Sequence, residues 1–436
     1  MDKAQDGHPE GYRVLTHDDI PAYIAGVPAI VAQLGGGPAD WTVRDVADGN
    51  LNAVYLVDGP AGGVCVKQAL PYVRVHHDWP LAVERALFEH AYMVRLDPFV
   101  GRGAPQLYHF DPTLFTIVME KLEPHIILRK GLIEGRHLPK AAPDTATFIA
   151  NATFNTSDLA APFERKFEDI AHFARNQALL RITMDLVLTD PYREVWRNRY
   201  VRPHMEGWAA SFRSDIELKT AVARHRIGFL TNTQALIHGD LHSGSVMVTE
   251  DDTRVIDGEF ASYGPIGLDT GAFIANLIMS WYAHGAYDRP EADRRAYRDW
   301  ILEQIAIFWA TFRDRFLTLW ENATEAGDAY PADYFTDTAG KARLATIRRD
   351  YLDGIFADTV AFAALKMNRR IIGYAQIADY LVIEDLERRA RAQAPALALA
   401  RALLTRPERF ADIAAILDAI PRFERAGLDP DAARHL

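Results

Sequence analysis

The chain has 436 residues, and 49% of them are hydrophobic, which is enough to bury a substantial core and suggests two lobes or domains. Its formal net charge of -11 argues against sequence-independent binding to nucleic acid or an acidic membrane, because both need clustered cations that neutralise phosphate groups. Apolar runs end too early to cross a bilayer, and residues 1–11 lack the apolar segment of a signal peptide, so we expect a cytoplasmic protein.

The first part of the chain predicts a small antiparallel sheet with one helix. Turn residues at 48–50 and 58–60 separate short β-rich runs, and residues 80–96 place apolar side chains at helical intervals. The single cysteine, Cys65, lies in one of these runs and cannot form an intramolecular disulfide, which fits a reducing compartment. The predicted strands are residues 41–47, 51–58, 63–69, 106–110 and 114–119.

Residues 120–124 interrupt the apolar pattern, and helical periodicity dominates beyond them. We therefore predict a hinge at 120–124 between a lobe of residues 1–119 and a lobe of residues 125–436. The helices expected in the second lobe are residues 163–188, 215–230, 269–283, 293–319 and 351–373. A small antiparallel sheet lobe followed by a larger helical lobe is an α+β organisation.

Lys67 is a candidate phosphate ligand on the third predicted strand. Kinase-like lobes place a lysine there that contacts the α- and β-phosphates of ATP. An isolated strand lysine is usually a solvated edge charge, but this one precedes a predicted helix that carries Glu84 and Glu89. Either glutamate could pair with it; we favour Glu89, although spacing alone leaves Glu84 open.

The turn between the first two strands is a second candidate for contacts with the nucleotide. Asp48, Gly49, Asn50 and Asn52 belong to it, and such residues suit a tight turn whose backbone amides could lie over phosphates. Asn-rich hairpin turns are common, so this interpretation depends on the nearby Lys67.

Asp240 is the candidate catalytic residue. It belongs to a His-Gly-Asp-Leu-His-Ser-Gly-Ser segment at 238–245, between short apolar runs at 235–237 and 245–248 that read as strands. In kinases an Asp on such a loop accepts the proton of the acceptor hydroxyl group. Asp240 would therefore hold the acceptor.

Two further carboxylates predict a metal site. If residues 254–259 form a strand, alternation sends Asp257 and Glu259 to the same face, where both could hold Mg²⁺ through oxygen. Kinases have an Asn five residues after the catalytic Asp; here that position is Ser245, whose hydroxyl is a weaker magnesium ligand. Glu259 would then supply the missing coordination.

His238 and His242 could resemble paired zinc ligands, but Gly239 and Gly244 argue against a helix, and no HExxH motif exists. We expect both imidazoles to form hydrogen bonds that fix the loop carrying Asp240.

Other segments accompany these motifs in order along the chain: residues 48–52, 66–72, 129–135, 189–191, 263–272, 274–277 and 369–373. Together with the segment at 238–245 and the Asp-x-Glu at 257–259, they closely resemble the methylthioribose kinases, which have an aminoglycoside and choline kinase-like fold. The resemblance extends from about residue 12 into the final helices.

The resemblance implies a two-lobed, protein-kinase-like α+β fold and an ATP-dependent kinase that phosphorylates the anomeric hydroxyl group of 5-methylthioribose. It implies Mg²⁺ as cofactor and a homodimer. Asp240 is implied as the catalytic base, Asp257 and Glu259 as magnesium ligands, and Lys67 as the phosphate contact.

The resemblance also implies that the backbone of Glu120, Lys121 and Leu122 hydrogen-bonds adenine. Arg369 and Arg370 are implied as cations of the sugar or phosphate site. Because neighbours on a helix point about 100° apart, one arginine could serve the site while the other pairs elsewhere. Trp79 resembles the aromatic residue of a mobile loop that borders the sugar.

The chain departs from the family at two positions. Gly258 stands where the family usually has proline, which could loosen the metal loop, and Ser262 stands where an aromatic residue is common. The second difference leaves the identity of the 5-substituent open. The alternatives are a related kinase for another 5-deoxypentose, choline or an aminoglycoside, or a catalytically silent nucleotide-binding scaffold.

Overall fold

A computed structural model describes residues 9–46, 51–74, 76–323, 327, 329–426 and 430. The chain divides into two compact units. The first comprises Met1–His125, Asn176–Leu179 and Arg254–Ala261, and the second comprises Ile126–Arg175, Leu180–Thr253 and Ser262–Leu436. The first unit thus takes in two short segments from later in the chain, which the sequence analysis did not anticipate. The hinge at 120–124 stays a prediction.

The first unit is built on a five-stranded antiparallel sheet in the order β1-β2-β3-β7-β6, which confirms the five predicted strands. Its helices α1 and α2 and the small hairpin β4-β5 were not predicted. The strands are β1 Thr42–Asp45, β2 Asn52–Asp58, β3 Gly63–Ala69, β4 Tyr72–Val73, β5 His76–Pro80, β6 Leu107–Asp111 and β7 Thr116–Glu120; the helices are α1 Ile20–Ala25, α2 Pro28–Leu34 and α3 Arg85–Val100.

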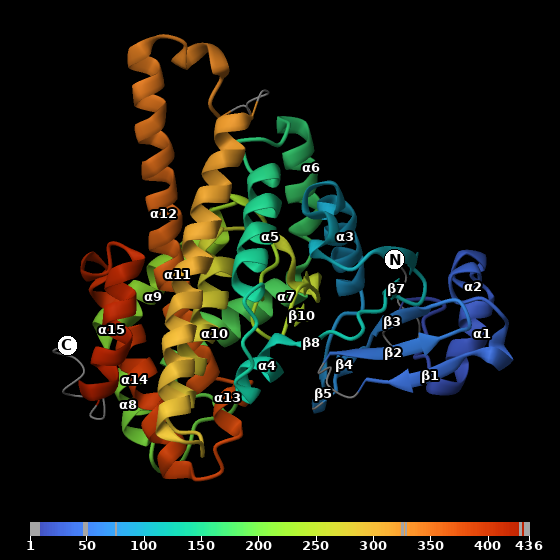
Figure 1. The fold of residues 1–436 in the computed structure, drawn as a ribbon, viewed down its shortest axis with the longest axis horizontal. Coiled ribbons are helices and arrows are strands. Elements are labelled where there is room, and N and C mark those ends of the chain that lie inside the picture. The colour runs from blue at the N-terminus through green and yellow to red at the C-terminus, as the bar shows by residue number, and fades with distance from the viewer. Residues whose placement is uncertain are drawn as a thin grey trace. The chain divides into compact units, whose positions relative to one another are not determined.

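Alternation along β3 divides its side chains between two environments. Val64 and Val66 pack with Ile20 of α1 and Leu34 of α2 in one hydrophobic cluster. Side chains of a strand alternate between faces, so Lys67 points to the opposite face. There it reaches α3. Figure 1 shows α1 and α2 beside the β1–β3 part of this sheet.

Helix α3 begins later than predicted. The sequence pattern placed a helix at residues 80–96, whereas α3 spans Arg85–Val100. Pro80 is instead the last residue of β5, where it lies opposite Tyr72, and the amide of Leu81 donates to the carbonyl of Pro71. Hairpin pairing therefore overrides the helical periodicity at residues 80–84.

The second unit is mainly helical. Its short strands pair as β8 with β10 and β9 with β12, both antiparallel. These strands are β8 Ile126–Ile127, β9 Ala235–Ile237, β10 Val246–Val248 and β12 Ser262–Gly264. The helices are α4 Leu128–Glu134, α5 Ala141–Thr156, α6 Phe163–Phe173, α8 Glu206–Ser214, α9 Ile216–Thr231, α10 Gly267–His284, α11 Glu291–Asn322, α12 Thr338–Ile371, α13 Ala378–Leu381, α14 Leu386–Thr405 and α15 Ile413–Ala426. Two remaining elements, α7 Gln177–Ile182 and β11 Thr253–Val255, straddle the boundaries of the units.

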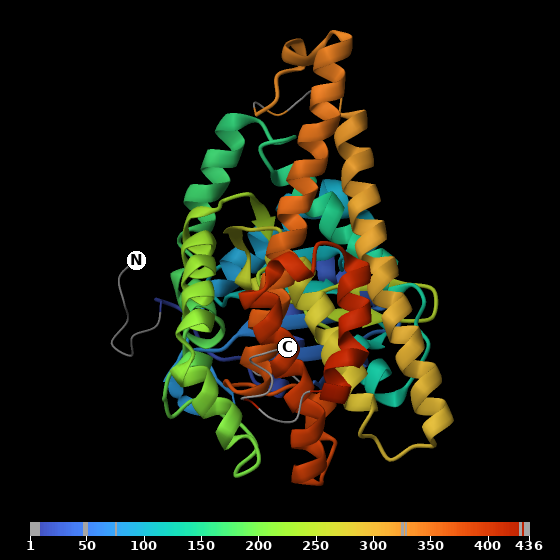
Figure 2. The same ribbon diagram turned by 90° about the vertical axis from the view of Figure 1, so that its left-hand side faces the viewer.

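The core of the second unit surrounds α10, of which every residue is buried. The long helices α11 and α12 run alongside each other in both views (Figures 1 and 2). Aromatic rings join them, with the centroids of Trp309 and Phe356 4.8 Å apart and those of Phe316 and Tyr351 6.0 Å apart. Helices α5 and α8 also belong to this unit, and the sequence analysis predicted neither of them.

Helix α12 approaches α10 closely because two glycines of α10 face it. A Cβ atom on Gly267 would lie 2.5 Å from the amide nitrogen of Thr359, and one on Gly271 would lie 2.5 Å from the carbonyl oxygen of Thr359. Between them, the hydroxyl groups of Thr270 and Thr359 are 2.6 Å apart. The position of α12 along α10 is therefore fixed by backbone contact.

Among the described residues, no single helix is long and apolar enough to cross a membrane. The pair His17–Ala25 and Pro28–Asp40 meets the length and composition criterion only when its two halves, bent by 107°, are counted together.

Replacing Gly271 with alanine tests the contact between α10 and α12. Because the new methyl group would meet backbone atoms, we expect Gly271→Ala to lower the free energy of unfolding by about 1–3 kcal/mol. Gly354 of α12 is the control, since a Cβ there meets nothing within 4 Å; Gly354→Ala should be neutral or stabilise by about 0.5–1 kcal/mol. Chemical denaturation of both variants measures the difference, and equal stability would contradict the contact.

Candidate active site

The first unit gathers the predicted phosphate and metal ligands into one cluster, in which only Asp257 is not buried. The ammonium of Lys67 lies 2.7 Å from Oε1 of Glu89 and 2.5 Å from Oδ1 of Asp257. The pairing of Lys67 with Glu89, favoured over Glu84, is thus present in the structure. Burial alone would lower the pKa of Lys67, but Asp257, Glu89 and Glu259 outweigh it and raise that pKa. Lys67 is therefore a permanent cation among three carboxylates.

The backbone that carries the two predicted metal ligands differs from the expectation. Residues 254–259 were predicted as one strand, but β11 ends at Val255. Asp257 has a φ of 71°, in the left-handed region, and Gly258–Phe260 form a 3₁₀ turn. A left-handed residue cannot continue a strand, so alternation does not bring the carboxylates together. The turn does so instead: ligand oxygens of Glu89, Asp257 and Glu259 all lie within 4.8 Å of one another.

Arg85, which the sequence analysis missed, balances Glu259. Its Nε donates to Oε2 of Glu259 at 2.9 Å, and its side chain is fully buried. Asn52 joins both residues, because its Nδ2 donates to Oε2 of Glu259 at 3.2 Å and its Oδ1 accepts from Arg85 at 3.0 Å. The remaining guanidinium hydrogen bonds go to the carbonyl groups of Leu51, Leu70 and Ala82. No sequence signal singled out Arg85, because its partner Glu259 lies 174 residues further along the chain.

The donor set of this cluster fits a hard divalent cation. Magnesium prefers carboxylate oxygens, and three carboxylates converge here. Asn52 and Arg85 both bind Glu259 through Oε2 rather than Oε1. The Asp257 side chain is 43% exposed, so an ion can reach it. Burial raises the pKa of Glu89 to about 7, and burial with Asp257 raises that of Glu259, so added positive charge would stabilise both ionised forms.

Gly258 is enclosed. A Cβ at this position would meet the Tyr92 ring at 2.4 Å, so that ring fills the space of a larger side chain. Asn176 donates from Nδ2 to the carbonyl groups of Glu259 at 2.9 Å and Ala261 at 3.1 Å. These contacts hold the Gly258–Phe260 turn in place.

The second unit surrounds Asp240 with cations. Its Oδ1 lies 2.7 Å from Nζ of Lys366 and 3.4 Å from Nη1 of Arg369, while its Oδ2 lies 3.7 Å from Nη2 of Arg370. Burial alone would raise the pKa of Asp240, but Lys366, Arg369 and His242 hold it well below its usual range. Asp240 is therefore an ionised carboxylate.

Both arginines of the pair reach the same carboxylate, although the sequence left open that one would pair elsewhere. Neighbouring helical positions diverge, but long guanidinium side chains can converge on a group beyond the helix surface. Sequence reasoning missed Lys366. Its position three residues before Arg369 and four before Arg370, on the same helical face, was the available signal.

The loop around Asp240 is fixed by hydrogen bonds, as expected from its histidines. Asp269 of α10 accepts from the amides of His238 at 2.6 Å and Gly239 at 2.9 Å. Nδ1 of His242 accepts from the Gly244 amide at 2.9 Å, and burial lowers the pKa of His242 to about 3. The neutral imidazole then carries its proton on Nε2, which lies 3.5 Å from Oδ2 of Asp240.

Ser245 has a structural contact in this loop, since its hydroxyl donates to the carbonyl of Asp240 at 3.2 Å. Arg129 of α4 donates to Nδ1 of His242 at 3.1 Å and to Oδ1 of Asn276 at 3.3 Å. These contacts tie the loop to α4 and α10.

Several predicted site residues have no tested role. Asp48, Gly49 and Asn50 lie outside the described residues. Trp79 is half-buried on β5. At the predicted hinge, Glu120 accepts from Arg254 at 3.1 Å, Lys121 pairs with Asp58 and Glu123, and Leu122 follows in the loop. Their contacts with a nucleotide stay predictions.

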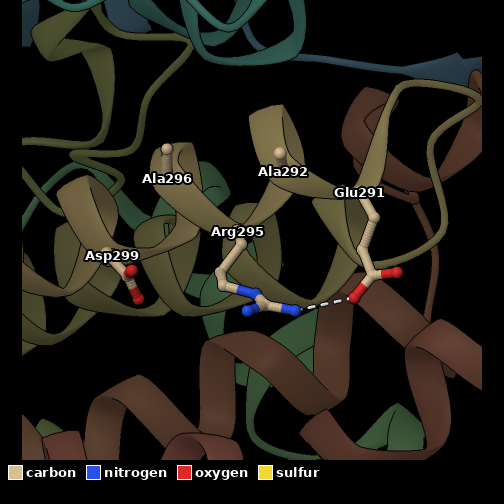
Figure 3. Close-up of a pocket in the computed structure, with 5 residues that line it drawn as sticks. All are labelled: Glu291, Ala292, Arg295, Ala296 and Asp299. Carbon is tan, nitrogen blue, oxygen red and sulfur yellow. Dashed lines mark hydrogen bonds and ion pairs between the residues drawn. The ribbon is translucent and has the colours of Figure 1, made fainter.

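A surface depression of about 500 Å³ on α11 contains none of the predicted site residues (Figure 3). Its lining residues are Glu291, Ala292, Arg295, Ala296 and Asp299, all exposed. Figure 3 shows the ion pair of Arg295 with Glu291, whose atoms are 2.7 Å apart. Both side chains are about three-quarters exposed, so this is an ordinary surface pair.

Carboxylates that can bind a metal ion, and a carboxylate among cations, are groups that phosphoryl transfer needs, and the comparison with known proteins points to the same reaction. Residues 42–308 match the model of the phosphotransferase enzyme family, which covers more than half of the chain. The class of the protein is therefore a phosphotransferase.

Curated relatives narrow this class. A methylthioribose kinase of Escherichia coli is 38% identical over 416 residues, covering 95% of this chain and 99% of the relative. Methylthioribose kinase 1 of Oryza sativa subsp. japonica is 39% identical over 419 residues, covering 95% and 97%. The chain belongs to the methylthioribose kinase family, and it is an ATP-dependent kinase, as the sequence predicted.

Solved structures are more distant. A choline/ethanolamine kinase family protein from Mesorhizobium loti is 14% identical with a TM-score of 0.41, covering 93% of this chain and 99% of that chain. A glucosamine kinase is 14% identical with a TM-score of 0.47, covering 91% and 88%. The family match and the sheet and helices described above confirm the predicted kinase-like α+β fold.

Replacing Arg85 with methionine tests the buried balance of charge in the first unit. Glu259 would keep its burial and lose its cation, so we expect Arg85→Met to lower the free energy of unfolding by about 3–5 kcal/mol. Arg295→Met removes an arginine from the exposed pair of Figure 3 and should cost less than about 1 kcal/mol. Denaturant titration measures both, and similar losses would contradict the assigned role of Arg85.

Proposed function

We propose that the protein transfers the γ-phosphoryl group of ATP to the anomeric hydroxyl group of 5-methylthioribose, giving 5-methylthioribose 1-phosphate for methionine salvage. The observation that carries this proposal is the Asp240 carboxylate, ionised among buried cations on a fixed loop. The names of the relatives support the choice of acceptor.

Asp240 would accept a hydrogen bond from the acceptor hydroxyl group. Because neighbouring cations keep its pKa low, it is a weak proton acceptor at neutral pH. Phosphoryl transfer through a loose transition state needs little early proton removal. Asp240 would therefore mainly orient the hydroxyl oxygen and receive the proton late in the reaction.

Lys67 would hold the α- and β-phosphates, and Asp257 with Glu259 would bind Mg²⁺. When bound, this ion neutralises charge on the phosphate oxygens. The turn containing Asp48, Gly49, Asn50 and Asn52 would cover the nucleotide, and the backbone of residues 120–122 would bind adenine. The side chain of Asn52 also supports Glu259, to which its Nδ2 donates at 3.2 Å.

Arg369 and Arg370 would stabilise negative charge on the transferred phosphoryl group, because both guanidinium groups lie beside the carboxylate that holds the acceptor. Trp79 would border the sugar. The family resemblance further supports a homodimer. The net charge of -11 supports an enzyme without nucleic-acid or acidic-membrane partners, and the single cysteine fits a cytoplasmic setting.

A panel of acceptors tests the proposal. Purified protein with ATP and Mg²⁺ should phosphorylate 5-methylthioribose in preference to ribose, choline and an aminoglycoside, measured as ADP release and as a phosphorylated product. Asp240→Ala should lower kcat by about 10²–10⁴-fold. Phosphorylation of choline without methylthioribose would favour the rival kinase, and equal turnover by wild type and Asp240→Ala would favour a silent scaffold.

The metal assignment has its own test. Asp257→Asn removes a charged oxygen ligand, so the Mg²⁺ concentration that gives half-maximal kcat should rise at least about tenfold. Asp251 is an exposed turn residue, and Asp251→Asn should leave the magnesium dependence unchanged. If both variants titrate like wild type, Asp257 is not a magnesium ligand.

A further inference from the structure

The two oxygens of the Asp240 carboxylate have different surroundings. Oδ1 makes a short, charge-assisted hydrogen bond with Nζ of Lys366 at 2.7 Å. The contacts of Oδ2 are all longer, at 3.5 Å to Nε2 of His242 and 3.7 Å to Nη2 of Arg370. Bonds near 2.7–2.9 Å are the strong ones for ionised partners, whereas contacts of 3.5–3.7 Å are weak and leave room for a closer donor.

The lysine is committed to this loop. Lys366 is only 3% exposed. Its ammonium group donates to Oδ1 of Asp240 at 2.7 Å and to the carbonyl oxygen of Gly239 at 3.3 Å. A buried ammonium without partners is costly, so these bonds fix both its side chain and the loop. Asp240 itself keeps 14% exposure of its side chain, so a small acceptor can still reach it.

The helix that carries Lys366 is itself immobilised. α12 contacts α10 at Gly267 and Gly271, and α10 holds the amides of His238 and Gly239 through Asp269. Because α10 anchors both α12 and the loop, Lys366 meets Asp240 in a defined geometry.

We infer that Lys366 is a positioning residue that occupies Oδ1 of Asp240 and thereby presents Oδ2 to the hydroxyl group of the acceptor. This inference rests on the proposed kinase function. In the transfer step the acceptor oxygen forms a bond to the γ-phosphorus and its proton passes to Oδ2. The bond between the γ-phosphorus and the β-γ bridging oxygen breaks, and its electron pair leaves on ADP.

Loss of the lysine would change how Asp240 titrates, in a known direction. The other charged or titratable groups facing Asp240 are Arg369, Arg370, His242 and, through its charge, Arg129. Without Lys366 the pKa of Asp240 rises, because the cation that lowers it most is gone. A carboxylate with a raised pKa is protonated at higher pH, so an acid limb that Asp240 sets moves to higher pH.

The experiment measures kcat, KM and the pH dependence of kcat/KM for wild type, Lys366→Met and Lys366→Arg with ATP and 5-methylthioribose. We expect Lys366→Met to lower kcat about 10–100-fold with little change in the KM for ATP, and to move the acid limb to higher pH. Lys366→Arg keeps the charge and should keep the acid limb of wild type. Lys166→Met is the matched control, since Lys166 is also 3% exposed and pairs with Asp158, and it should leave the profile unchanged.

A double-mutant cycle separates positioning from a general structural effect. If Lys366 acts through Asp240, adding Lys366→Met to Asp240→Asn should not lower kcat further. This comparison also serves if Lys366→Met alone does not fold, because the double variant removes both charges of the pair. A wild-type profile for Lys366→Met, or additive losses in the cycle, would overturn the inference. Wild type that phosphorylates no acceptor would instead overturn the proposed function.

Discussion

The structure depends on balancing ionised groups that are buried away from water. A buried charge costs several kcal/mol unless an opposite charge and hydrogen bonds compensate it. Each unit holds a cluster of this kind, with Lys67 and Arg85 among carboxylates in the first and Asp240 among cations in the second. The two clusters have opposite composition. One concentrates negative charge that suits a metal ion, and the other concentrates positive charge around a single carboxylate that suits a phosphoryl group and its acceptor.

Backbone packing fixes both clusters. In the first unit, strand alternation turns Lys67 toward Glu89 of α3. The left-handed residue Asp257 begins the turn that brings the Glu259 carboxylate close to those of Glu89 and Asp257. In the second unit, glycines of α10 allow α12 to approach, and Asp269 of α10 holds the loop around Asp240. Rigid supports of this kind matter because phosphoryl transfer relies mainly on positioning and electrostatics.

Much of this organisation could be predicted from the sequence, because it follows from local patterns of apolar and turn residues. The strands near Lys67 and the loop around Asp240 follow from alternation and turn residues. Arg85 could not be found, because its partner Glu259 lies 174 residues further along the chain. The turn after Val255 was predicted as strand because a left-handed conformation leaves no mark on the apolar pattern. Lys366 carried a usable signal in its helical spacing to the arginine pair, but its partner Asp240 lies 126 residues away.

The most direct test of the account is a crystal structure of the protein with Mg²⁺, a nonhydrolysable ATP analogue and 5-methylthioribose. The account predicts the anomeric oxygen about 2.6–3.2 Å from Oδ2 of Asp240, with the metal on Asp257 and Glu259 at the phosphates. A sugar bound away from Asp240, or a metal held by other residues, would contradict it.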